Sequence, residues 1–193
     1  SFSGNSSSVI SAFEVVDGYD FHLYDSAGDG KIKKTGSRYV RAVWTNNSNS
    51  CFYMHGGTIT DFKQSSWAGG AVCLDRGKMY MYGGAITNCS CGGNGGGAVA
   101  VNNGYFSMEG GTISGNSGGT RGGGVYVESS ASSFVMESGS ISSNNALYGG
   151  GVYSNNKSCF LSSFIYFFIE KITIKLGYSL LDLFNYEKGK ENG

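Results

Sequence analysis

The chain has 193 residues, among them 33 glycines and no proline, and 40% of its residues are hydrophobic. Average usage predicts roughly 14 glycines and 10 prolines in a chain of this length, so the composition excludes collagen, which needs proline, and its apolar content excludes flexible linkers. The formal net charge is zero, so we expect no basic surface that could neutralise nucleic acid phosphates.

The first forty residues contain faint copies of a pattern that becomes regular further along the chain. Phe13-Glu-Val15 and Phe21-His-Leu23 alternate apolar and polar residues, as half-buried strands do. Phe2-Ser-Gly-Asn5 is similar to a later segment, Ile113-Ser-Gly-Asn116. We therefore expect the architecture of the later segments to begin near Phe2.

Between these faint copies, the spacing of Asp25, Asp29 and Gly30 matches the first half of a calcium-binding loop. The third position of that loop is Ala27, and the twelfth is Gly36 instead of a bidentate glutamate. Two carboxylates hold calcium weakly, so we expect a turn with a glycine at positive φ and no metal site.

Residues 42–159 contain an internal repeat of about 27 residues. One marker is a methionine shortly before a small-residue pair, and it recurs once in every repeat. These methionines are Met54, Met81, Met108 and Met136. The other marker is a valine after a glycine run, which recurs with the same period to within one position. These valines are Val72, Val99, Val125 and Val152.

Each repeat predicts three short strands, which in the third copy lie near 106–108, 112–114 and 125–127. Glycine and Gly/Asn corners at positive φ separate them. Three strands in this length predict an all-β fold, a single-stranded right-handed parallel β-helix, in which each strand pairs with its equivalent about 4.8 Å away. Proline has no backbone N–H and would remove a hydrogen-bond donor from the ladders between coils, so this architecture explains why the chain contains no proline. Residues 1–159 would form about five coils and an incomplete one.

Residues 160–193 leave the repeat. Ile172 to Leu176 alternates like a strand, and Leu180 to Phe184 has helical spacing. We expect either a strand and helix that cap the last coil or an end that is not native to the repeat domain. The apolar run from Phe160 to Ile169 is shorter than the about 20 residues that cross a bilayer, so no transmembrane segment is expected.

Five cysteines, an odd number, do not make a complete disulfide framework. They are Cys51, Cys73, Cys89, Cys91 and Cys159. We expect these cysteines to be small buried residues or turn residues and to form no metal site. One disulfide among them stays open as an alternative. Cys51 and Cys159 are separated by four repeat periods, which predicts that they lie in one column. Four coils are too far for these two to bond to each other.

Short tetrapeptides in the repeat resemble those of a known family. Gly-Gly-Ala-Val at 69–72 and 96–99 and Phe2-Ser-Gly-Asn5 are similar to the per-coil motifs of the chlamydial polymorphic outer membrane proteins and other adhesin-like extracellular β-helix proteins. The resemblance implies a non-enzymatic adhesin-like repeat protein, secreted or at the cell surface, whose faces bind a glycan or a host protein. A polysaccharide hydrolase or lyase and a purely structural stalk stay as alternatives.

Aromatic residues at outward positions form the candidate ligand-stacking surface. Trp44, Tyr126 and Tyr153 fall in one column, and Tyr53 and Tyr80 fall in another. Exposed aromatic rows can stack on sugar rings or anchor a protein partner. The alternative is cross-strand pairing that only stabilises the sheet.

Glu109 and Glu137 are the candidate catalytic pair. Each follows a repeat methionine, which predicts a separation of about 5 Å, near that of the carboxylates of retaining glycosidases. Residues 51–159 contain only five Lys/Arg and five Asp/Glu, and no repeat clusters carboxylates beside a basic residue as a lyase requires. We therefore expect no catalytic residue, no metal and no cofactor.

Overall fold

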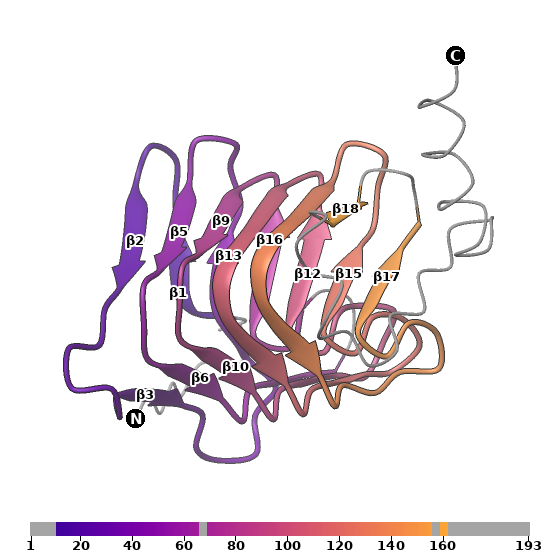
Figure 1. Cartoon of the computed structure of the whole chain (residues 1–193), viewed down its shortest axis with the longest axis horizontal. Helices are drawn as coiled ribbons and strands as arrows, with labels where there is room; N and C mark the ends of the chain where they lie inside the picture. Colours follow the sequence, from indigo (N-terminus) through magenta and orange to yellow (C-terminus); the bar gives the residue numbers. More distant parts are fainter. Residues whose placement is uncertain (1–10, 66–68, 156–158, 162–193) are drawn as a thin grey trace, which may run out of the picture.

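The fold is seen in a computed structural model that describes residues 11–65, 69–155 and 159–161. This part of the chain is all-β without a helix, and its strands pair in parallel with the strand one coil further on. The result is a β-solenoid of about five turns with coils of about 27 residues, which confirms the predicted parallel β-helix. Figure 1 shows the coils side by side in sequence order.

Three sheet faces surround the core, each named here for its main inward residue. The valine face consists of β1 (Ser11–Val15), β4 (Arg41–Thr45), β8 (Val72–Asp75), β12 (Val99–Asn102), β15 (Val125–Val127) and β17 (Val152–Ser154). The methionine face consists of β2 (Asp20–Leu23), β5 (Cys51–Met54), β9 (Lys78–Met81), the first halves of β13 (Tyr105–Ser114) and β16 (Ser133–Ser142), and β18 (Cys159–Leu161). The isoleucine face consists of β3 (Lys31–Lys33), β6 (Thr58–Thr60), β10 (Ala85–Thr87) and the second halves of β13 and β16.

Columns of like residues fill the interior, as the repeat predicts. Phe52, Met79, Phe106 and Phe134 are register partners in successive coils, and each is completely buried. The methionine, isoleucine and valine columns are buried in the same way. Because each coil adds one apolar residue to every column, neighbouring coils bury each other's core.

The strand pattern differs from the prediction in two places. In β13 and β16 the methionine and isoleucine faces are joined by one continuous strand, because the chain bends at register shifts near Glu109 without leaving the ladder. A further small sheet also follows the isoleucine face. It consists of β7 (Lys63–Gln64), β11 (Ser90–Cys91) and β14 (Ser117–Gly118).

Glycine serves two different purposes at the two glycine corners. Between the methionine and isoleucine faces, Gly84 has φ +82°, a conformation that other L residues rarely adopt. Before the valine face, a Cβ on Gly69 would lie 1.7 Å from the carbonyl oxygen of Val72. There the backbone itself fills the space, so the prediction of positive φ explains the first corner but only part of the second.

Asparagine holds the corner after the isoleucine face. The buried Asn116 side chain donates to the carbonyl oxygen of Ile86 at 2.9 Å and accepts from the backbone N–H of Cys89 at 2.9 Å. The Asn144 side chain repeats the donor contact one coil later, to the carbonyl oxygen of Ile113 at 2.8 Å. These side chains supply partners to backbone groups that the turn leaves unpaired.

Two predictions about the late part of the chain have different outcomes. Cys159 pairs with Phe134, whereas Cys51 pairs with Lys78, so the prediction of one cysteine column is wrong by one register position. The cause is that the last coil, from Phe134 to Cys159, is shorter than the coils before it. The strand expected from Ile172 to Leu176 and the helix expected from Leu180 to Phe184 lie outside the described residues.

Candidate functional site

Six aromatic or imidazole side chains project from the outer side of the methionine face in the first three coils. We call them the aromatic array. Its first row is His22, Tyr53 and Tyr80, and its second row is Tyr24, His55 and Tyr82. Alternation in β2, β5 and β9 produces the rows, because the intervening residues of each strand point into the core.

The rings within each row stack face to face. In the first row the ring centroids are 4.5 Å apart for His22 and Tyr53, and 5.2 Å apart for Tyr53 and Tyr80. In the second row they are 4.2 Å apart for Tyr24 and His55, and 5.1 Å apart for His55 and Tyr82. The planes in these pairs differ by 2° to 23°. Because the rings cover each other's faces, the array offers its ring edges to a ligand.

One polar contact joins the rows. Nδ1 of His22 and Nε2 of His55 are 3.2 Å apart, so one imidazole donates a hydrogen bond to the other. The outer tyrosines are open to solvent, since Tyr24 is 67% exposed and Tyr82 is 42% exposed, and His22 is exposed as well. The surface of the array is therefore a set of phenol hydroxyls and imidazole edges on a rigid sheet.

Two phenols of the array, those of Tyr53 and Tyr80, stay neutral. A hydrogen bond with Cys51, together with partial burial, raises the pKa of Tyr53 to about 12. Burial also raises the pKa of Tyr80. Both hydroxyls can therefore donate and accept hydrogen bonds across the physiological pH range.

The array ends at the fourth coil. The ring of Tyr105 is tilted by 53° against Tyr80, at a centroid distance of 5.8 Å. The next residues of the first row are Ser107 and Val135, which carry no ring. The array is thus confined to the amino-terminal half of the solenoid.

The predicted column on the valine face is present in register but is not an open aromatic row. Cys73 and Ala100 lie between Trp44 and Tyr126, so Trp44 is not adjacent to the two tyrosines. Tyr126 is only 2% exposed, which makes the prediction of an exposed stacking residue wrong there. Tyr153 follows it at a centroid distance of 6.0 Å.

Neighbouring side chains fold over this column. Asn155 donates to the Tyr126 hydroxyl at 2.9 Å, and Arg121 also donates to it. The Arg121 guanidinium lies 5.4 Å from the centre of the Tyr153 ring, and Arg41 lies 5.7 Å from that of Trp44. Both arginines thus cover aromatic faces that a ligand would need.

The candidate catalytic carboxylates are not register partners. Glu109 pairs with Ser138, because the ladder shifts by one position after Met108 and shifts back before Thr112. The expected alignment of Glu109 with Glu137 is therefore wrong, since this local irregularity separates two residues that the repeat places in one column. Glu109 accepts a hydrogen bond from Ser107 at 3.3 Å.

Asp25 forms a turn, as expected. Its carboxylate accepts hydrogen bonds from the backbone N–H groups of Ala27, Gly28 and Gly30 at 3.1, 2.9 and 2.9 Å. Gly28 has φ +84°. Within the described residues, no three His, Cys, Asp or Glu side chains gather where they could hold a metal ion.

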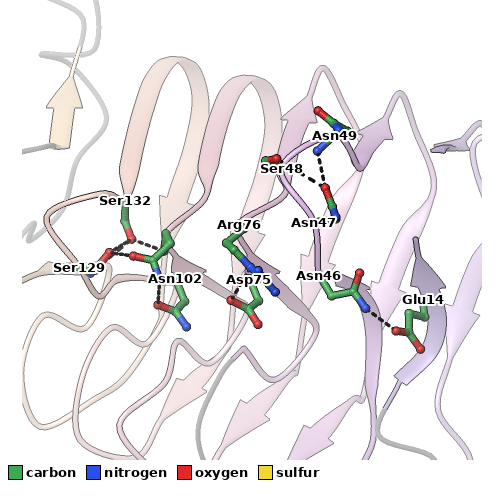
Figure 2. Close-up of polar contacts among 11 residues, drawn as sticks. Glu14, Asn46, Asn47, Ser48, Asn49, Asp75, Arg76, Asn102, Ser129 and Ser132 are labelled. Atoms are coloured by element: carbon green, nitrogen blue, oxygen red, sulfur yellow. Dashed lines mark hydrogen bonds and ion pairs between the residues drawn. The ribbon is translucent and has the colours of Figure 1, made fainter. Parts of the chain in front are cut away.

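A row of polar residues lies at the corner between the valine and methionine faces (Figure 2). Asn46 donates to Glu14 at 2.6 Å, and Ser129 donates to Asn103 at 2.7 Å. The oxygens of Ser129 and Ser132 are 2.9 Å apart. These groups bond to one another within and between coils, so we assign them to corner structure.

Sequence reasoning missed four members of the array: His22, Tyr24, His55 and Tyr82. Their signal was present, because His55 and Tyr82 each directly follow a repeat methionine. The position after the repeat methionine holds His55, Tyr82, Glu109 and Glu137 in successive repeats, which in the sequence are unrelated polar residues. Only the structure shows that the rings of His55 and Tyr82 lie against the first row.

Comparison with family models, curated proteins and solved structures finds no match. In the part of the chain that the structure describes, no helix is long and apolar enough to span a membrane.

Proposed function

We propose that this chain is a non-enzymatic, adhesin-like repeat module, secreted or at the cell surface, that binds a glycan or a host protein through the aromatic array. The observation that carries the proposal is the array itself: six stacked rings with exposed hydroxyl and imidazole edges.

Tyrosine suits such a surface because it brings a large contact area with little conformational entropy to lose. Stacking within the array restricts its rings before a ligand arrives, so binding costs less ordering. The regular spacing of the coils repeats a phenol or an imidazole in each row along the first three coils, which matches a ligand that is itself extended or repetitive.

Binding to an array of immobilised glycans and to extracellular-domain proteins tests the proposal. We expect Tyr82→Ala to weaken capture of the bound ligand by about tenfold, a typical cost of removing an interface tyrosine. Tyr148→Ala is the matched control, since Tyr148 is 43% exposed, Tyr82 is 42% exposed, and Tyr148 contacts Tyr153 on the valine face.

Three outcomes would reject the proposal. Equal binding by the Tyr82→Ala and Tyr148→Ala variants would show that the ligand does not contact the array. Release of reducing or unsaturated ends from a polysaccharide would favour the alternative of a β-helix hydrolase or lyase. Absence of any bound ligand would leave the structural stalk as the better description.

A further inference from the structure

The net charge of zero hides a strong local excess of cations. Residues 31–60 include five Lys or Arg and no Asp or Glu. Three lysines, two from this region and one just after it, line one pocket of about 480 Å³. They are Lys33, Lys34 and Lys63. Ser37, Tyr39 and Asp61 line the same pocket. The volume is within the range of small-molecule sites, about 300–1,000 Å³.

The pocket is built by a loop that is fastened at both ends. The backbone N–H of Lys34 donates to the carbonyl oxygen of Thr60 at 3.3 Å, and that of Val40 donates to the carbonyl oxygen of Lys63 at 2.7 Å. The segment between them therefore lies against the second coil, where the isoleucine face ends. This attachment places Ser37 and Tyr39 beside lysines from two coils.

The positive charge in the pocket is only partly compensated. Lys33 lies 3.4 Å from Asp61, which is the one carboxylate among the lining residues. Lys34 donates to the carbonyl oxygen of Gly36 and has no anionic partner among those residues. Burial, and next the charge of Lys63, lowers the pKa of Lys34. An anion between the two lysines would relieve this repulsion.

We propose that this pocket binds a sulfate or phosphate group, carried on a sugar or free in solution. Lys34 and Lys63 supply the charge, and the Ser37 and Tyr39 hydroxyls can donate to the remaining oxygens. The pocket has room for more than the anion alone, which favours a sulfated or phosphorylated sugar. The site does not depend on the aromatic array.

The test compares two double variants with the same change in net charge. Lys34→Gln/Lys63→Gln removes the cations of the pocket, and Arg76→Gln/Lys78→Gln removes two exposed cations at a different corner. Sodium sulfate is titrated against sodium chloride at equal ionic strength while Tm is measured. A heparin-derived tetrasaccharide and its desulfated form are then titrated by calorimetry.

We expect sulfate to raise Tm of the parent and of the Arg76→Gln/Lys78→Gln control, and to have no specific effect on the pocket variant. The sulfated tetrasaccharide should bind the pocket variant about tenfold more weakly than the control. Tighter binding of the tetrasaccharide than of sulfate identifies a sugar-borne group, and binding of sulfate alone identifies a free anion. The proposal is overturned if sulfate has no specific effect on the parent, or if both variants lose binding equally.

Discussion

The outer sides of the methionine and valine faces both carry tyrosines, but these tyrosines differ in their exposure to solvent. On the methionine face, Tyr53 and Tyr80 stay partly open within a stacked array. On the valine face, Tyr126 occupies the same kind of outward position but is only 2% exposed, because Arg121 and Asn155 reach over it. The period of a strand identifies the side on which a residue lies, whereas flanking turns decide whether that side meets solvent.

The largest expected difference between the two faces is in stability. Tyr126→Ala should lower the free energy of unfolding by roughly 3–5 kcal/mol, the cost of emptying a buried aromatic site. Tyr53→Ala should cost only about 1 kcal/mol, mainly lost stacking. Urea unfolding followed by circular dichroism measures both, and equal losses would contradict the contrast.

Two cysteines, one on each of these faces, provide a second comparison. Burial raises the pKa of Cys73, on the valine face, to about 11. Cys51, next to the array, is more exposed, although burial raises its pKa as well. We expect iodoacetamide at pH 8 to modify Cys51 at least about tenfold faster than Cys73, because alkylation needs an accessible thiolate.

Peptide mapping by mass spectrometry measures the two rates in the native protein. The same reaction in urea is the control, since unfolding should make the two thiols react alike. Comparable rates in the native state would show that the valine face is open.

Removing the Arg121 side chain should expose part of the outer side of the valine face. Arg121→Ala loses the contact over Tyr153 and a hydrogen bond to Tyr126, which predicts a loss of about 1–2 kcal/mol in stability. Arg76→Ala is the control, because its ion pair with Asp75 is at the surface and contributes little. Acrylamide quenching of tyrosine fluorescence should increase only in Arg121→Ala.

The smallest effect concerns the titration of Tyr53. Its raised pKa, about 12, means that the fold favours the neutral phenol. This contribution to stability is fully present below the unfolded pKa, about 10, and is lost as pH rises through about 12. The absorbance titration at 295 nm should lose one late-titrating phenol in Tyr53→Phe relative to the parent. Loss of a phenol that titrates near pH 10 instead would contradict the hydrogen bond with Cys51.

The motif residues that suggested a family have structural roles in this molecule. Gly69 has no space for a side chain, and Asn116 bonds to backbone groups of the previous coil. Such residues are dictated by the turns of the solenoid, so they predict the fold well and carry little information about a ligand. The net charge of zero likewise gave no sign of the cations around Lys34, because a total charge does not show where charges gather.

The sequence by itself determined the coil length, the core columns and the absence of proline, because each coil must offer the same apolar residues and backbone donors to the next. Only the tertiary structure decided the rest. A local register shift put Glu109 and Glu137 out of alignment, and the side chains of Arg121 and Asn155 cover Tyr126. A loop brings Lys34 and Lys63 to the same pocket. These features depend on which groups meet across different coils and turns, and the period of one strand does not contain that information.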